Sequence, residues 1–241
     1  MSDMAPQPVV TLHGMAASTC TRRVLFLCNE LGITVNLVEV DLMKGEQKTP
    51  GFLKLQPFGK VPVLVDEDNG VTLFESRAIL RYLADTYGGN TLVYPTLWGG
   101  APAADGDAAE GDAAEGADAL RRMRALVDQW VEVEASTWNP LVSAVVAEAV
   151  FAPWRGQTTD EAVVNAKLGE LRARVLPVYE AHLSDGRKYL AGDEFTLADI
   201  THAPYTHYML GAGGACADAF EGFPNVRSWW DRVSGRVTFP R

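Results

Sequence analysis

The sequence predicts an α/β domain at the amino end of the chain and an all-α domain after it. Two observations support this division. Before residue 90, stretches with strand patterns alternate with stretches of helical periodicity. Beyond Gly89 the strand patterns stop, and apolar residues recur at helical spacing. With 241 residues and 47% hydrophobic content, the chain is long enough to build both cores.

The first domain, assigned to residues 1–89, is expected to run strand, helix, strand, helical link, two strands and helix. Gly32 suits the end of the first helix, because glycine readily adopts the left-handed conformation found there. Asn69 and Gly70 separate two short apolar runs, which is a strong hairpin signal. This order of elements is that of the thioredoxin-like fold (βαβ-α-ββα). The elements are expected at residues 8–13, 18–32, 34–42, within 61–76 as a hairpin, and at 76–88.

The second domain, assigned to residues 118–241, shows helical periodicity only. Thr196 and Asp199 have the spacing of a capping box, in which each side chain binds the backbone N–H of the other residue. Pro177 lies inside a periodic stretch and should kink that helix or remove one of its hydrogen bonds. Helices are expected at residues 118–148, 159–184, 196–210 and 223–236.

An acidic, low-complexity linker, residues 90–117, separates the two domains. It contains GDAAE twice in tandem, and this composition cannot bury a core, so a loop or a solvated extension of the next helix is expected. A calcium loop starting at Asp105 is excluded, because Ala109 and Glu110 occupy positions that need a ligand and a glycine.

Composition narrows the functional classes. The formal net charge of −10 disfavours a nucleic-acid partner, since phosphate binding depends on Lys and Arg. No apolar stretch approaches membrane-spanning length, and the amino terminus lacks the pattern of a secretory signal. Cys20, Cys28 and Cys216 have neither metal-ligand spacing nor an even number, so a reducing, cytoplasmic setting is expected.

The stretch FGKVPVL predicts a peptide-binding edge. The fold places a cis proline where Pro62 opens a strand, and that geometry would turn the backbone N–H and C=O of Val61 outward to pair with an extended peptide. The alternative is an edge-strand proline without a functional role.

Glu75 and Ser76 lie at a predicted strand-to-helix junction. The helix start there offers unpaired N–H groups to a carboxylate, while Glu75 could take an ammonium group. A γ-glutamyl peptide carries both groups on one residue. Ser76 is also expected to be the helix N-cap.

Five stretches in register resemble the glutathione transferases, specifically the plant-type phi class. They are MAASTCTRRVL, DLMKGEQKTPGFLKLQPFGKVPVL, LFESRAILRYLA, TDEAVV and YLAGDEFTLADITHAPY. The resemblance implies conjugation of glutathione, as co-substrate and without a metal, to small hydrophobic electrophiles. Reduction of organic hydroperoxides is implied as a second reaction, and a homodimer as the assembly. Repulsion between the acidic linkers of two subunits would weaken such a dimer.

The resemblance also implies site residues. The phi-class catalytic serine falls on Ser18. Gln47 and Lys60 depart from the histidine and glutamine usual in the class, although either can still contact glutathione. The implied glutathione contacts are Gln47, Lys48, Lys60, Val61, Pro62, Glu75 and Ser76.

The chemistry follows from thiol acidity. A free thiol has a pKa near 8.5, so about 3% is thiolate at neutral pH. Ser18 cannot serve as a resting base, but its hydroxyl can donate a charge-assisted hydrogen bond to the sulfur anion. The start of the following helix adds positive potential. Thr19 is a weaker candidate for the same role.

Other residues near the site have competing interpretations. Cys20 is expected to be a packing residue, although thiol transfer through Cys20 is an alternative function. Arg22 and Arg23 are assigned no catalytic role. His202 and His207 are expected to be packing residues rather than metal ligands.

The second substrate is expected in an apolar pocket between the domains. The resemblance implies that Trp138 lines it, with a core position as the alternative, and Met15 is expected to face it from the loop before Ser18. A non-catalytic carrier of hydrophobic ligands is the alternative in which this pocket binds without turnover.

Overall fold

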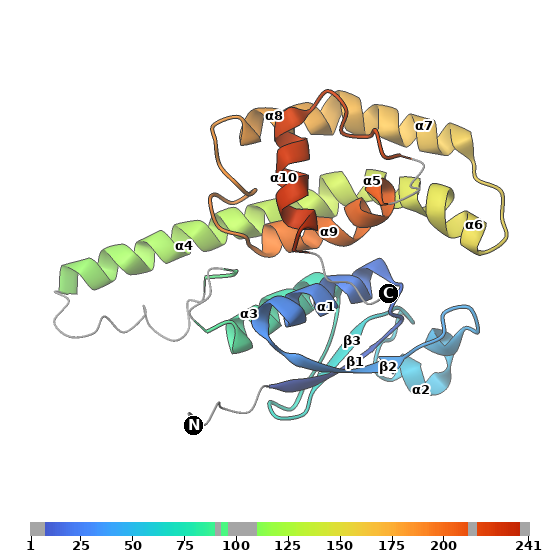
Figure 1. Cartoon of the computed structure of the whole chain (residues 1–241). Helices are drawn as coiled ribbons and strands as arrows, with labels where there is room; N and C mark the ends of the chain where they lie inside the picture. The colour runs from blue at the N-terminus through green and yellow to red at the C-terminus, as the bar shows by residue number, and fades with distance from the viewer. Residues whose placement is uncertain (1–7, 90–92, 96–109, 212–215, 237–241) are drawn as a thin grey trace. The chain divides into compact units, whose positions relative to one another are not determined.

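The computed structural model describes residues 8–89, 93–95, 110–211 and 216–236, with only the backbone given for 110–115 (Figure 1). The chain separates into two compact units near residue 98. The first unit has the predicted α/β order and the second is helical, so the predicted fold class is confirmed. None of the described helices has the length and apolar character needed to cross a membrane.

The first unit is built on a four-stranded sheet with the order β2-β1-β3-β4. β1 pairs in parallel with β2 and antiparallel with β3, so Leu12 faces Leu37 on one side and Leu64 on the other. β3 and β4 form the predicted hairpin, and Gly70 in its turn has φ +65°. The strands are β1 Val9–Gly14, β2 Thr34–Glu39, β3 Val63–Asp66 and β4 Val71–Phe74.

Two helices, α1 (Thr19–Leu31) and α3 (Ser76–Tyr87), lie side by side on one face of this sheet (Figure 1). Their inward side chains, such as Leu27 and Ile79, are fully buried. Gly32 ends α1 in the left-handed conformation, as predicted. This packing places the amino ends of both helices at fixed positions relative to the sheet.

The link between β2 and β3 contains a 3-10 turn, Glu46–Lys48, and the short helix α2, Pro50–Leu53. Phe52 of α2 packs with Val40 and Val63 in a small separate core. The link is therefore anchored at α2, while the preceding turn keeps its polar side chains near the surface.

The first helix of the second unit begins earlier than the periodicity predicts. α4 begins at Glu110, so the final part of the predicted linker is helical, and residues 96–109 lie outside the described part of the chain. Ala and Glu are strong helix formers, which accounts for a helical start whose sequence has no apolar pattern. The described helices are α4 Glu110–Val133, α5 Asn139–Val146, α6 Ala152–Trp154, α7 Glu161–Glu170, α8 Leu176–Leu183, α9 Leu197–Leu210 and α10 Pro224–Ser234.

Three prolines of this unit follow irregular helical turns, whereas Pro204 lies inside the α-helix α9. The predicted effect of Pro177 is seen as a π-helical segment, Leu171–Val175, which ends two residues before the proline. Pro140 and Pro153 follow the π-helical segments Glu134–Trp138 and Ala147–Phe151 in the same way. Because proline removes one backbone donor and crowds the preceding turn, a wider turn accommodates it without breaking the helix.

The predicted capping box is present at the start of α9. Oδ2 of Asp199 accepts from Thr196 N at 3.0 Å, and Oδ1 accepts from Leu190 N at 3.1 Å and from Trp229 Nε1 at 2.8 Å. Asp199 is fully buried, and this burial raises its pKa to about 6 against the opposing effect of the donors. One carboxylate thus joins α9, α10 and the segment before α9.

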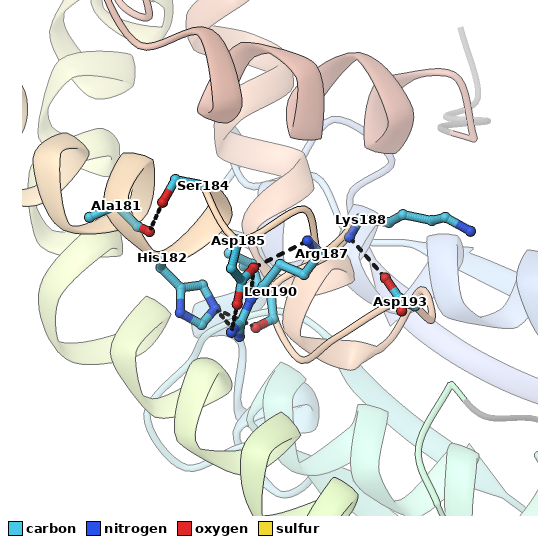
Figure 2. A network of polar contacts seen from close by, with 8 residues as sticks. All are labelled: Ala181, His182, Ser184, Asp185, Arg187, Lys188, Leu190 and Asp193. Atoms are coloured by element: carbon cyan, nitrogen blue, oxygen red, sulfur yellow. Dashed lines mark hydrogen bonds and ion pairs between the residues drawn. The ribbon is translucent and has the colours of Figure 1, made fainter.

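A second polar network holds the turn after α8 (Figure 2). Nε2 of His182 lies 2.8 Å from the Leu190 carbonyl and 2.9 Å from Nη1 of Arg187, whose guanidinium also pairs with Asp185. Burial lowers the pKa of His182, and the Arg187 side chain lowers the pKa of Asp185. The network fixes Leu190, whose backbone N–H binds Asp199.

Candidate active site

Ser18 is the N-cap of α1, with φ −67° and ψ 129°. Its Oγ accepts from Thr21 N at 3.5 Å, and its own N–H donates to the Met15 carbonyl at 2.8 Å. The bond to Oγ is at the long limit for an N–H···O hydrogen bond, and Ser18 is half-buried. The hydroxyl is therefore held at a helix start, where its proton can be donated to a bound anion.

The loop before Ser18 is tied down at Ala16. Its N–H lies 3.3 Å from Oε2 of Glu39, and its carbonyl accepts from Nε of Arg22 at 3.1 Å. Arg22 thus has a structural role in this loop. Met15, predicted to contact the second substrate, is half-buried in this loop.

The Val61–Pro62 peptide bond is cis, as the sequence pattern predicts. β3 begins at Val63, one residue after Pro62, so Val61 lies two residues before the strand, and it is half-buried. Lys60 is exposed beside it.

Gln47 and Lys48 come from the turn before α2. Nζ of Lys48 donates to the Phe58 carbonyl at 2.9 Å, which fixes this side chain across the loop that leads to Pro62. Oε1 of Gln47 is buried and has no hydrogen-bond partner in the described residues. Gly59 lies against this turn and has φ +60°. A Cβ at Gly59 would lie 2.7 Å from the Gln47 carbonyl oxygen.

Glu75 occupies the N-cap position of α3 and has φ 69° and ψ 103°, which is strained for a residue with a side chain. Its carboxylate makes no capping hydrogen bond and the residue is exposed. The predicted junction is confirmed, but the prediction that Ser76 is the N-cap is wrong by one residue. β4 ends at Phe74, and Glu75 with its positive φ occupies the N-cap. Ser76 is therefore the first helical residue of α3.

Arg23, to which the sequence pattern assigns no catalytic role, lies between α1 and α3. Its side chain is fully buried, and Nη1 donates to Ser76 Oγ at 2.8 Å and to Cys20 Sγ at 3.7 Å. Its position in the sequence indicates this burial, because Arg23 precedes the buried Leu27 by four residues and so lies on the same inward face of α1. An arginine on such a stripe needs internal partners.

Trp138, for which a place in the substrate pocket and a place in the core are both predicted, is buried in the helical unit. Its side chain is 0% exposed, and its ring contacts Tyr179, His202, Phe220 and Trp229 inside the helical unit. These ring contacts favour the core alternative for Trp138. A large aromatic side chain buries much apolar surface, which suits Trp138 to a place in a helical core.

His202 is also part of this core. Nδ1 lies 2.6 Å from the Ala198 carbonyl, so it carries the proton, and Nε2 accepts from the Tyr179 hydroxyl at 2.9 Å. This arrangement supports the packing interpretation of His202. Within the described ranges, no group of three or more His, Cys, Asp or Glu side chains could hold a metal ion.

These features define a class: a thioredoxin-like domain with a cis proline, two helix starts that carry hydroxyl groups, and a helical domain behind it in sequence. Family models agree. Residues 17–86 match the glutathione S-transferase N-terminal domain, and residues 142–236 match its C-terminal domain.

Individual relatives extend the match to almost the whole chain. Glutathione S-transferase F10 of Arabidopsis thaliana is 39% identical over 233 residues, covering 96% of this chain and 94% of the relative. Glutathione S-transferase 3 of Zea mays is 38% identical, covering 99% and 93%. The crystal structure of glutathione transferase F2 from Populus trichocarpa aligns with a TM-score of 0.77 at 35% identity, covering 93% of each chain.

The chain belongs to the glutathione S-transferase family, and it resembles the plant phi class within that family. It is accordingly an enzyme of the glutathione S-transferase type.

Proposed function

We propose that this protein conjugates glutathione to small hydrophobic electrophiles and that Ser18 stabilises the reacting thiolate. The observation that supports the role of Ser18 is its position at the N-cap of α1, with Oγ receiving a long 3.5 Å hydrogen bond from Thr21 N. Because Oγ is the acceptor in this bond, the hydroxyl proton of Ser18 is not used by it and can be donated to a ligand.

The energy required is modest. Lowering the thiol pKa by about two units makes thiolate the main form at neutral pH and needs about 2.7 kcal/mol of preferential stabilisation of the anion. A charge-assisted hydrogen bond from Ser18 contributes about 1.5–3 kcal/mol. The positive end of α1 adds about 0.3–1 kcal/mol. The two effects together are sufficient.

The remaining predicted residues would orient the tripeptide. Glu75 would pair with the γ-glutamyl ammonium, and Ser76 would bind the carboxylate of the same residue at the start of α3. Val61 would pair with the cysteinyl backbone. The glycine carboxylate would be held by the side chains of Gln47, Lys48 and Lys60.

The electrophile class is supported by a relative. A glutathione S-transferase I structure from maize, 31% identical with a TM-score of 0.75 and covering 94% of this chain and 92% of its own, was determined with an atrazine glutathione conjugate. The same thiolate would also attack a peroxide oxygen, which is the proposed second reaction. The free thiols of Cys20, Cys28 and Cys216 suit a reducing, cytoplasmic setting, and a homodimer is the proposed assembly.

The experiment compares Ser18→Ala with the wild type in conjugation of glutathione to chlorodinitrobenzene. The variant is expected to lose at least about tenfold in kcat, which corresponds to 1.4 kcal/mol, while still binding a glutathione column. Ultraviolet titration of enzyme-bound glutathione should show the thiolate near neutral pH in the wild type and at higher pH in the variant.

Cys20→Ser is the matched control, because it changes a side chain on the same helical turn and is expected to keep both properties. Thiol-transferase activity that is lost in Cys20→Ser and retained in Ser18→Ala would favour thiol transfer through Cys20. A wild-type rate equal to the uncatalysed one, with hydrophobic ligands still bound, would favour the carrier.

A further inference from the structure

Arg23 connects the starts of the two helices that carry the proposed site. It lies in the first turns of α1, five residues after Ser18, and its Nη1 donates to Oγ of Ser76, the first residue of α3. The N···O distance is 2.8 Å, and both residues are buried. These two groups are 53 residues apart in sequence.

The direction of this hydrogen bond constrains the hydroxyl. A guanidinium can only donate, so Ser76 Oγ is the acceptor and its own proton points elsewhere. A serine near a helix start otherwise rotates its hydroxyl among several local acceptors and donors. With one lone pair engaged by Arg23, the Ser76 hydroxyl is restricted to orientations in which its proton is available to a different acceptor.

The charge acts in the same direction. Arginine is always protonated in proteins, and a hydrogen bond from a charged donor is stronger than one from a neutral donor. It polarises the hydroxyl it contacts, which makes Ser76 a better donor to an anion. The backbone N–H groups at the start of α3 favour an anion at the same place.

We propose that Arg23 is a positioning residue that holds Ser76 as a hydrogen-bond donor to the α-carboxylate of the γ-glutamyl group. This inference rests on the proposed glutathione-binding function. Arg23 does not contact the ligand in this scheme. It acts through Ser76, and it also joins α3 to the turn of α1 that bears the proposed thiolate donor.

The test measures equilibrium binding of S-methylglutathione, whose sulfur cannot ionise, so the role of Ser18 does not enter. Arg23→Gln is expected to weaken binding about tenfold, the effect of losing one charge-assisted hydrogen bond. Ser76→Ala should weaken it by a similar factor. In the Ser76→Ala background, Arg23→Gln should cost less than about twofold, because the shared interaction is already absent.

An analogue without the α-carboxylate, 4-aminobutyryl-S-methylcysteinylglycine, separates positioning from general structural support. Arg23→Gln is expected to leave its affinity unchanged within about twofold. Cys20→Ala is the matched control, since it removes the other acceptor contacted by Nη1 and should leave both affinities unchanged. Thermal unfolding of each variant confirms that the compared proteins are folded.

Equal losses for the two ligands, or additive effects of Arg23→Gln and Ser76→Ala, would overturn the proposal. If Arg23→Gln does not fold, the same cycle with Arg23→Lys decides, because a single ammonium cannot reproduce the guanidinium geometry and the coupling should have the same sign. Wild-type protein that fails to bind S-methylglutathione would instead refute the proposed function itself.

Discussion

The hydroxyl of Tyr82 donates a 2.6 Å hydrogen bond to Oδ2 of the buried Asp66. Tyr87 donates to the same oxygen at 2.6 Å, and Asn69 donates to both carboxylate oxygens from the hairpin turn. One carboxylate therefore joins β3 and its turn to α3, whose first residues belong to the proposed site. Burial alone would raise the pKa of Asp66, but these donors outweigh it and lower the pKa.

Acid is expected to weaken the first unit through Asp66. Because the folded-state pKa lies below the unfolded value of about 3.9, this carboxylate contributes stability above that pH, and the contribution is lost as pH falls through the folded-state pKa. Asp66→Asn should be less stable than the wild type at pH 7. It should also lose less stability than the wild type on acidification to about pH 3. Urea unfolding at both pH values measures this, with the exposed Asp68→Asn as the control. Parallel acid curves for the wild type and Asp66→Asn would contradict it.

Asp199 has the opposite dependence on pH. Its folded-state pKa of about 6 lies above the unfolded value of about 3.9, so its contribution is present below the unfolded pKa and is lost as pH rises through about 6. Asp199→Asn should destabilise the protein by about 3 kcal/mol. The amide NH₂ that replaces one carboxylate oxygen cannot accept the hydrogen bonds which that oxygen accepts in the wild type. The stability difference from wild type should grow between pH 7 and pH 4.

Thermal unfolding across this pH range checks the expectation for Asp199. Asp193→Asn is the control, since its carboxylate accepts a long 3.4 Å hydrogen bond from Lys188 N in an exposed turn (Figure 2). A stability difference between Asp199→Asn and wild type that stays constant with pH would show that burial does not raise the pKa as described.

Gly59→Ala is expected to raise the KM for glutathione several-fold. A Cβ at this position would lie 2.8 Å from Nζ of Lys48 and 2.7 Å from the Gln47 carbonyl, so both predicted glycine-carboxylate ligands must shift. The left-handed φ of +60° adds a cost of about 1 kcal/mol.

Gly45→Ala separates the two effects of the Gly59 substitution. Gly45 has φ +76°, but nothing lies within 4 Å of an added Cβ, so the substitution should reduce stability and leave KM unchanged. Equal KM values for Gly59→Ala and Gly45→Ala would show that the contacts around Gly59 do not position the site.

Much of this architecture was predictable because its signals are local. The end of α1 at Gly32 and the hairpin turn at Gly70 follow from glycine's access to positive φ, and the start of α9 follows from the spacing of Thr196 and Asp199. The cis bond before Pro62 was predicted from its place between a loop and a hairpin.

The remaining features depend on distant parts of the chain. Arg23 meets Ser76 only when α1 and α3 pack side by side, so spacing within either segment does not reveal the pair. Trp138 has the residue type expected of both a pocket and a core, and its burial is decided by rings from three other segments. The early start of α4 at Glu110 reflects intrinsic helix propensity without an apolar pattern.

Glu75→Gly is expected to stabilise the protein while weakening glutathione binding. Glu75 has φ 69°, and a residue with a side chain held there costs about 1–3 kcal/mol, whereas glycine adopts it freely. Glycine's greater freedom in the unfolded chain offsets about 0.5–1 kcal/mol of that relief, so a net gain of about 1 kcal/mol is expected. The lost carboxylate removes the proposed partner of the γ-glutamyl ammonium.

Glu75→Gln distinguishes strain from charge, because it keeps the side chain at the strained position and removes the ionised group. It should weaken S-methylglutathione binding as much as Glu75→Gly does, with thermal stability close to wild type. Calorimetric binding and thermal unfolding of the three proteins measure the two properties separately. If Glu75→Gly were instead less stable than Glu75→Gln, the positive φ of Glu75 would not be a source of strain, and the proposed exchange of stability for ligand recognition at the start of α3 would fail.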